Sequence, residues 1–263
     1  MNLELLVAAL NADVDQLINK MQIETDAIII NQCDKYTHEN KSITVDDKER
    51  LIDIYNMDER GVGLSRNNAL TRATKDIILF SDEDIEYVKG YEKIIINEFQ
   101  RCPQADILLF QVEVDAKRRT YNNTSFSKVN LFNCGRYPAY SMAIRREKLH
   151  KSGVMFSLLF GGGAKYSNGE DSLFIRACIK AGLKTYRTPL LIGKENIRES
   201  TWFKGYTEKF FFDRGVLFHF LYGKAAYIWA IRFILCKKKV MCNDISAKNA
   251  LQLIFNGIKE GVG

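Results

Sequence analysis

The chain opens with an apolar run, an apolar spacing typical of a helix, and a second apolar run. Residues 3–10 predict a first buried strand and residues 27–30 a second. Between them, residues 14–21 carry apolar side chains at helical spacing, and Asp13 provides a helix N-cap. Strand, helix and strand within about 30 residues indicate a parallel β-α-β unit. Residues 35–48 are polar and predict a loop.

The same alternation of strand and helix patterns continues to residue 191 and indicates an α/β fold. Residues 115–135 are polar and predict an ordered loop or a short hairpin, and residues 161–163 are three glycines that predict a flexible loop. The remaining predicted strands are residues 51–55, 77–80, 107–114, 140–144 and 185–191, and the remaining predicted helices are residues 64–73, 89–100 and 172–181.

The character of the chain changes beyond residue 195, where aromatic and aliphatic residues become frequent. Residues 216–235 form a mostly apolar run that is long enough to cross a bilayer. Charged residues within it make a spanning helix costly, so a helix lying in the membrane interface is favoured. A helical appendage packed on the protein's own core explains the pattern equally well.

The net charge of +6 is concentrated in this last part of the chain. Residues 194–263 hold 12 Lys and Arg against 6 Asp and Glu, whereas the first 193 residues hold 26 of each. A neutral body argues against a general nucleic-acid-binding protein, and a basic tail suits an anionic surface. The six cysteines have no close-paired metal spacing and no signal peptide is visible, so we expect reduced thiols in a cytoplasmic protein.

Three carboxylates follow the predicted strand at residues 77–80. Extended backbone would place Asp82 and Asp84 on one face and Glu83 on the other. Two carboxylates at the carboxyl end of a buried strand suit Mg²⁺ or Mn²⁺ shared with substrate phosphates. For this motif alone, a solvated acidic turn is the simpler interpretation.

Two predicted helix starts carry further candidate chemistry. Arg66 lies near the first of them, where free N–H groups and a guanidinium can bind an anion, although a capped helix with a solvated arginine is the alternative. Asp171 follows Gly169 and Glu170 at the second, where it is either a general base or only a helix cap. Residues 198–203 mix charge, hydroxyl and indole, and either close over a substrate or anchor the tail.

The order of these segments resembles the family 2 glycosyltransferases, which have the Rossmann-like GT-A fold. The matching segments are residues 63–67, 77–84, 140–149 and 169–182, and the resemblance covers residues 3–205. It is closest to bacterial members that build capsular, exopolysaccharide or lipopolysaccharide chains. The resemblance implies an inverting, metal-dependent hexosyltransferase with a mostly parallel mixed sheet.

The resemblance also assigns roles to individual residues. Asp84 would bind the Mn²⁺ or Mg²⁺ ion that bridges the donor diphosphate, and Asp82 would face the ribose or the water shell of the metal. Arg66 would lie near the nucleotide. Asp171 would be the catalytic base, with Glu170 as its partner on the acceptor side.

Several positions depart from the family pattern. The first strand ends in Asn11 without the aromatic residue often found near the base, and the second ends in Asn31 and Gln32 in place of acidic residues. We expect these amides, with Glu83, to contact the nucleotide, and since an amide can pair with uracil, a UDP-sugar is the expected donor. The histidine often seen after the last strand is absent, and Glu199 is a candidate replacement on the metal side.

The expected organisation is a catalytic domain at residues 1–195 followed by a basic, aromatic-rich helical tail at residues 196–263. Within the domain, residues 1–100 would bind the nucleotide sugar and residues 101–195 the glycan or lipid-linked acceptor. We expect the protein to act at the inner face of the cell membrane and to bind no nucleic acid. The altered strand ends leave an alternative: a non-catalytic nucleotide-sugar-binding subunit or scaffold of a glycan-assembly complex.

Overall fold

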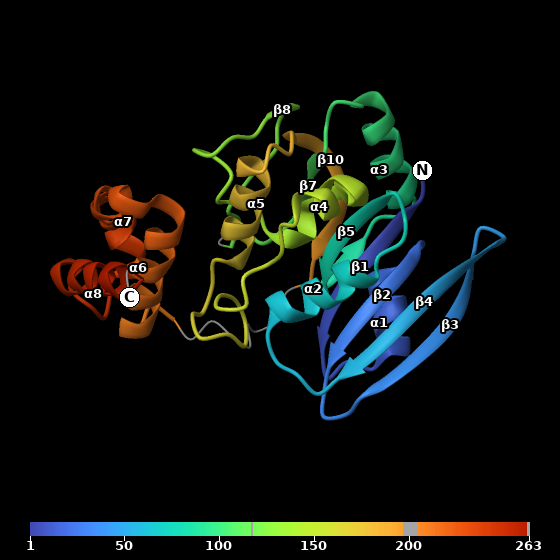
Figure 1. The fold of residues 1–263 in the computed structure, drawn as a ribbon, viewed down its shortest axis with the longest axis horizontal. Coiled ribbons are helices and arrows are strands. Elements are labelled where there is room, and N and C mark those ends of the chain that lie inside the picture. Colours follow the sequence, from blue (N-terminus) through green and yellow to red (C-terminus); the bar gives the residue numbers. More distant parts are fainter. Residues whose placement is uncertain (117, 197–204, 262–263) are drawn as a thin grey trace.

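The computed structural model describes residues 1–116, 118–196 and 205–261, and within them ten strands form one mixed sheet (Figure 1). The strands are β1 (Leu3–Leu10), β2 (Asp26–Gln32), β3 (Thr37–Val45), β4 (Lys48–Met57), β5 (Ile77–Asp82), β6 (Ile85–Tyr87), β7 (Ile107–Glu113), β8 (Ser127–Lys128), β9 (Met142–Arg145) and β10 (Thr185–Glu195). Their order across the sheet is β3-β4-β2-β1-β5-β9-β7-β10-β6, and β8 pairs with β10.

Four neighbouring strands of the sheet are parallel, and three of them, β1, β2 and β5, are buried on both faces. β4, β2, β1 and β5 run parallel, β9 is antiparallel between β5 and β7, and β10 is parallel to β7. Apolar side chains of β1 alternate between two core clusters, one on each face, as strand geometry requires. The carboxyl ends of β1, β2 and β5 therefore meet at one edge of the sheet.

Helices cover both faces of the sheet. Those on one face are α1 (Val14–Met21) and α3 (Tyr91–Arg101), and those on the other are α2 (Val62–Arg72), α4 (Arg146–Ser152) and α5 (Glu170–Lys180). The Asp13 side chain caps α1 as predicted, accepting from the backbone N–H groups of Asp15 and Gln16. The α/β prediction is therefore confirmed.

The prediction of a loop at residues 35–48 is wrong. β3 and β4 form a long antiparallel hairpin at the edge of the sheet, with Asp46 and Asp47 in the left-handed region at its turn. Most side chains of β3 are exposed, so the strand lacks the apolar alternation that would have revealed it. The backbone ladder with β4 holds it in place, and Ile43 packs against the core.

The prediction of one helix across residues 216–235 is also wrong. The run divides into α6 (Glu208–Tyr222), a 3₁₀ turn at Gly223–Ala225 and α7 (Ala226–Met241), and α8 (Ala247–Glu260) follows. Gly223 interrupts the run with a φ of +54° and a ψ of −126°, a conformation that favours glycine. Among the described helices, none has the length and apolar character needed to cross a bilayer.

Close glycine contacts join α6 to α8 and fix the C-terminal helices as a packed unit. A Cβ atom on Gly215 would lie 2.0 Å from the Ile254 carbonyl oxygen, and one on Gly257 would lie 2.0 Å from the Phe212 carbonyl oxygen. α6 also packs on the α/β part, where its Leu217 belongs to a buried cluster containing residues of the segment before α5. The apolar side chains of α6 are thus largely used inside the protein.

Candidate active site

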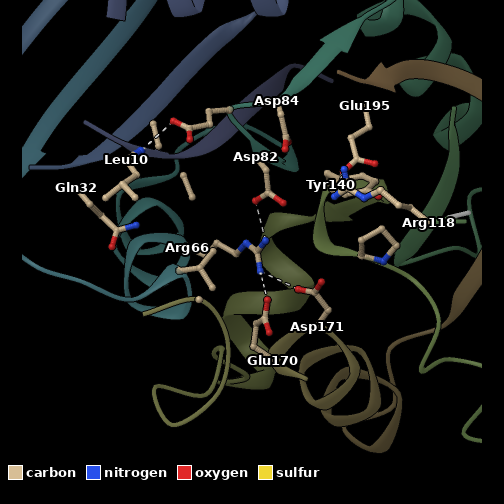
Figure 2. A pocket seen from close by; sticks show the side chains of 16 residues that line it. Leu10, Gln32, Arg66, Asp82, Asp84, Arg118, Tyr140, Glu170, Asp171 and Glu195 are labelled. Atoms are coloured by element: carbon tan, nitrogen blue, oxygen red, sulfur yellow. Dashed lines mark hydrogen bonds and ion pairs between the residues drawn. The ribbon is translucent and has the colours of Figure 1, made fainter. Parts of the chain in front are cut away.

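A cleft of about 290 Å³ lies where the carboxyl ends of β1, β2 and β5 meet the starts of α2 and α5 (Figure 2). The sheet register aligns the strand ends, pairing Ala8 with Asp82 and Leu10 with Gln32. Ligands of open α/β sheets bind at this edge. The geometry thus brings the acidic segment after β5 and the Glu170-Asp171 pair to one cavity.

The acidic residues after β5 form a tight turn and not a continued strand. β5 ends at Asp82, and Glu83 and Asp84 connect it to β6. The predicted alternation beyond Asp82 is therefore wrong, although all three residues line the cleft. The Glu83 carboxylate accepts a hydrogen bond from the Leu10 backbone N–H at 3.0 Å, which ties the turn to the end of β1.

Arg66 of α2 connects the acidic turn to the start of α5 (Figure 2). Its guanidinium, 3% exposed, lies 2.7 Å from Asp82 Oδ1 through Nη2. Through Nη1 it lies 2.8 Å from Asp171 Oδ1 and 3.2 Å from Glu170 Oε1. Burial lowers the pKa of Arg66, but the three carboxylates outweigh burial and the net shift is upward. One buried cation therefore pairs with Asp82 of the acidic turn and with Glu170 and Asp171 at the start of α5.

Asp171 lies on the first turn of α5, and its pKa is raised there. Burial and the negative charge of Glu170 raise the pKa of Asp171 to about 8, whereas Arg66 acts in the opposite direction. A carboxyl group with a raised pKa is a stronger base once it is ionised, which suits the removal of a proton from a hydroxyl group.

Gly169 shapes the turn that carries Glu170 and Asp171. Its φ is +118°, and a Cβ atom there would lie 2.5 Å from the δ-carbons of Leu217 on α6. The preceding segment is fixed to the same helix, because the buried Asp213 carboxylate accepts from the Ser167 backbone N–H at 2.8 Å. The C-terminal helices thus support the turn from behind.

The predicted nucleotide-contacting amides divide between two cavities. Gln32 lines the cleft and accepts from the Gly61 backbone N–H at 2.7 Å. Asn11 and Asn31 line a neighbouring cavity of about 370 Å³. The Asn31 side chain is already used there, accepting from the Ala12 N–H and donating to Asn56 Oδ1, each at 2.9 Å. Contact of these amides with a nucleotide stays a prediction.

Three further cleft residues were missed by the sequence analysis. Arg118 lies 2.8 Å from Glu195, and Tyr140 lines the cleft beside them. Burial, then the charge of Glu195, raises the pKa of Tyr140. Glu195 is the last residue of β10, which continues past its predicted end at residue 191, and Arg118 lies in the polar segment that carries no periodic signal. Glu199 and the proposed closing segment at residues 198–203 lie outside the described residues.

The comparisons with known proteins decide the family. Residues 9–160 match the profile of Glycosyl transferase family 2. The chain belongs to this family. It is therefore a glycosyltransferase, and the family resemblance read from the sequence is confirmed. No curated protein sequence matches the chain.

Solved structures show the same fold as this glycosyltransferase. TarS from S. aureus, residues 1–349 in complex with UDP-GlcNAc, has a TM-score of 0.58 at 15% identity, with 98% of this chain and 72% of that chain covered. A mannosyltransferase from Pyrobaculum calidifontis in complex with GDP-Man and Mn²⁺ has a TM-score of 0.53 at 13% identity, with 99% and 75% covered. The GT-A fold with C-terminal helices is thereby confirmed.

The glycosyltransferase offers a donor set that suits a hard divalent ion shared with a substrate. No group of three His, Cys, Asp or Glu residues in the described part of the chain could hold a metal by itself. Asp82 and Asp84 nevertheless bring two carboxylates to the cleft, and Asp84 is 8% exposed. Mg²⁺ and Mn²⁺ commonly take one or two carboxylates and complete their shell with phosphate and water. These residues fit such an ion.

Proposed function

We propose that this glycosyltransferase transfers a sugar from a nucleotide sugar, with inversion, to a glycan or lipid-linked acceptor of a bacterial surface polysaccharide. The observation that carries the proposal is the cleft in which Arg66 joins the acidic turn to Asp171 (Figure 2). The proposed donor is a UDP-sugar. This choice is supported by the TarS complex with UDP-GlcNAc and by Gln32, whose amide lines the cleft.

Each side of the cleft has a separate task in this mechanism. Asp171 accepts the proton of the acceptor hydroxyl, and Glu170 orients that acceptor. Asp84 and Asp82 would hold the metal ion, which supplies positive charge against the negative charge of the leaving diphosphate. Inversion needs base and leaving group on opposite sides of the sugar, and Figure 2 shows the two acidic groups entering the cleft from opposite sides.

Arg66 positions both groups and sets the charge that Asp171 experiences. Its guanidinium makes hydrogen bonds to all three carboxylates around it, so their relative positions are fixed before the substrate arrives. A diphosphate bound beside Asp82 would compete for Arg66. Loss of that partner would raise the basicity of Asp171 when the donor is present.

Calorimetric titration of UDP with and without Mn²⁺ tests the donor side. Native protein should bind UDP only with Mn²⁺, and Asp84→Ala should lose at least about tenfold in affinity, the change expected from one charged contact. Asp244→Ala, which removes an exposed carboxylate between α7 and α8, is the matched control and should bind as native protein does. Metal-independent binding that Asp84→Ala leaves unchanged would refute the donor-site assignment.

Turnover decides between the enzyme and the alternative. With a UDP-sugar and a lipid-linked acceptor, native protein should release UDP and Asp171→Asn should not. Binding of nucleotide by native protein without turnover of any acceptor would favour the non-catalytic subunit instead.

A peripheral membrane contact belongs to the same proposal, and α7 is its most suitable element. Ile228 and Leu235 are 71% and 65% exposed, and Ile231 lies on the same helical face. Arg232 and Lys239 lie close to this face at helical spacing, and both are exposed. An apolar stripe with basic neighbours suits an anionic membrane surface.

Vesicle co-sedimentation tests the membrane contact. Protein should bind vesicles containing anionic lipid, and Ile228→Asn with Leu235→Asn should abolish binding. Leu190→Asn with Leu191→Asn, which changes two exposed leucines of β10, is the matched control. Equal binding by the two double variants would contradict the assignment of α7.

A further inference from the structure

A second cleft, outside the candidate active site, lies between the catalytic part and the C-terminal helices. Its volume is about 350 Å³, and it is lined by the segment at residues 131–136, by α5, by the end of α6 and by residues 229–237 of α7. Figure 1 shows α5 between the sheet and the C-terminal helices. The cleft therefore opens on the side of α5 that faces away from the sheet.

The lining of this cleft is strongly basic. Among the described residues, its lining includes four cations, Arg136, Arg176, Arg232 and Lys237, and no Asp or Glu. Within the described part of the chain, none of these four cations has a carboxylate within 4.0 Å. Arg66, in contrast, is neutralised by three carboxylates inside the protein. The charge of the second cleft is thus available to a ligand.

Two of the arginines are held in place by aromatic rings. Arg176 of α5 packs over Tyr222, 5.6 Å from its ring centroid, and Tyr222 stacks on Trp229 with 4.6 Å between centroids. Arg232 packs over Trp229 at 5.2 Å. This ladder of cation, ring, ring and cation fixes both guanidinium groups at the cleft wall before a ligand binds.

Arg176 is also held by the backbone, because one of its terminal nitrogens donates to the Leu131 carbonyl oxygen at 3.2 Å. Its Nε is buried, so only its terminal nitrogens are available to a ligand in the cleft. Guanidinium groups match phosphate oxygens in geometry as well as charge.

The position of the cleft relates it to the acceptor. Asp171 lines the candidate active site, and the next residue, Ser172, lines the basic cleft. The two cavities therefore flank the first turn of α5, separated by roughly one helix diameter, ~10 Å. A group bound in the basic cleft would lie close to the base that activates the acceptor hydroxyl.

We propose that the basic cleft binds a phosphate group carried by the acceptor. The proposal rests on the glycosyltransferase function above, and it names a chemical property of the acceptor. Phosphate bound in this cleft would hold the acceptor on the Asp171 side of the enzyme, away from the donor diphosphate at Asp84.

Fluorescence of Trp229 tests the proposal without turnover. The chain has two tryptophans, so Trp202→Phe leaves Trp229, in the cleft wall, as the only reporter. We expect inorganic pyrophosphate, titrated at constant ionic strength without metal, to change its emission saturably. Arg176→Gln with Arg232→Gln should weaken binding at least about tenfold, the change expected from the loss of one charged hydrogen bond.

Two further variants separate local contacts from general charge and from folding. Arg136→Gln with Lys237→Gln removes two exposed cations of the cleft and should also weaken binding. Lys248→Gln with Lys259→Gln removes the same charge from α8, outside the lining, and should leave binding within about twofold because salt screens distant charges. No saturable change, or equal effects of the cleft and α8 variants, would overturn the proposal.

The experiment also distinguishes this site from the donor site and identifies the source of the phosphate. Asp84→Ala should leave the Trp229 response intact, because Asp84 lines the other cavity. Phosphatidylcholine vesicles carrying farnesyl diphosphate provide a lipid-bound probe. Tighter binding of that probe than of free pyrophosphate would assign the phosphate to a lipid anchor. Equal binding of the two would assign it to the sugar chain. No response to either would refute the proposal that the cleft binds phosphate.

Discussion

Replacing Arg66 by methionine should destabilise the protein in a way that depends on pH. Methionine keeps an unbranched side chain beside Phe156 but removes the cation that three carboxylates share. Asp82, Glu170 and Asp171 would then face one another across the cleft without compensation. Without Arg66, which lowers it, the pKa of Asp171 would rise further, since burial and the charge of Glu170 already raise it.

The magnitude follows from burial and ion pairing. Removing one partner of a buried ion pair costs about 3–5 kcal/mol. The three carboxylates are 28%, 13% and 22% exposed, so solvent relieves part of the repulsion and the lower end applies, about 3 kcal/mol at pH 8. A carboxyl group whose pKa is higher in the folded state than in the unfolded state stabilises the fold at low pH and loses this contribution as pH rises. The deficit should therefore shrink to about 1 kcal/mol at pH 5.

Urea unfolding at pH 5 and pH 8 measures this difference directly. Arg72→Met on the same helix is the matched control, since Arg72 packs over Tyr55 at 4.6 Å and has no carboxylate partner in the described part of the chain. Its deficit should not change with pH. If the free energy of unfolding of Arg66→Met fell short of native protein by the same amount at both pH values, the three-carboxylate account of Arg66 would be refuted.

Three more predictions concern the base and the glycines. Because the pKa of Asp171 is raised to about 8, kcat/KM should rise with pH through a limb well above pH 4, and Asp171→Asn should remove activity across the whole profile. Gly169→Ala should lower kcat at least about tenfold with UDP affinity nearly unchanged, because the new Cβ meets Leu217 and displaces the base but not the donor side. Gly257→Ala should reduce the free energy of unfolding by about 3 kcal/mol in urea titrations, since its Cβ would overlap a backbone carbonyl of α6. Gly135→Ala, whose nearest neighbour would lie at 3.7 Å, should change it by less than about 0.5 kcal/mol.

The parts of the fold that the sequence predicted well are those with a strong apolar signal. β1, β2, β5 and β7 are largely buried on both faces, so each contains at least four consecutive apolar residues and the runs are easily recognised. The strand at residues 51–55 was predicted and lies in β4, whereas β3 was missed because an edge strand exposed to water needs no apolar stripe. The apolar run at residues 216–235 was wrongly predicted as one helix. Hydrophobicity alone does not show whether α6 buries its side chains in protein or in lipid.

The candidate site was only partly predictable for a related reason. Asp82, Asp84 and Asp171 are found from local motifs, because a strand end or a helix start gives each carboxylate a recognisable context. Arg118 and Glu195 have no such context, and they enter the cleft only through the path of the chain around β10. The amides at the ends of β1 and β2 could not be assigned from sequence either. Only packing decides that Gln32 lines the cleft, whereas the Asn31 side chain bonds to Ala12 and Asn56.

The charges that line the cleft explain why a metal ion belongs to the proposed function. Among the described residues, six carboxylates and two guanidinium groups line it, which is an excess of negative charge even if Asp171 is protonated. A donor diphosphate brings more negative charge, and Arg66 and Arg118 are both already paired with carboxylates. Coulomb repulsion in a partly buried site would oppose donor binding unless a cation enters with the diphosphate. In the proposed function, Asp82 and Asp84 would hold that cation and it would supply positive charge to the diphosphate. Asp171 enters the cleft from the other side of Arg66, so the base would stay separate from the residues that hold the cation.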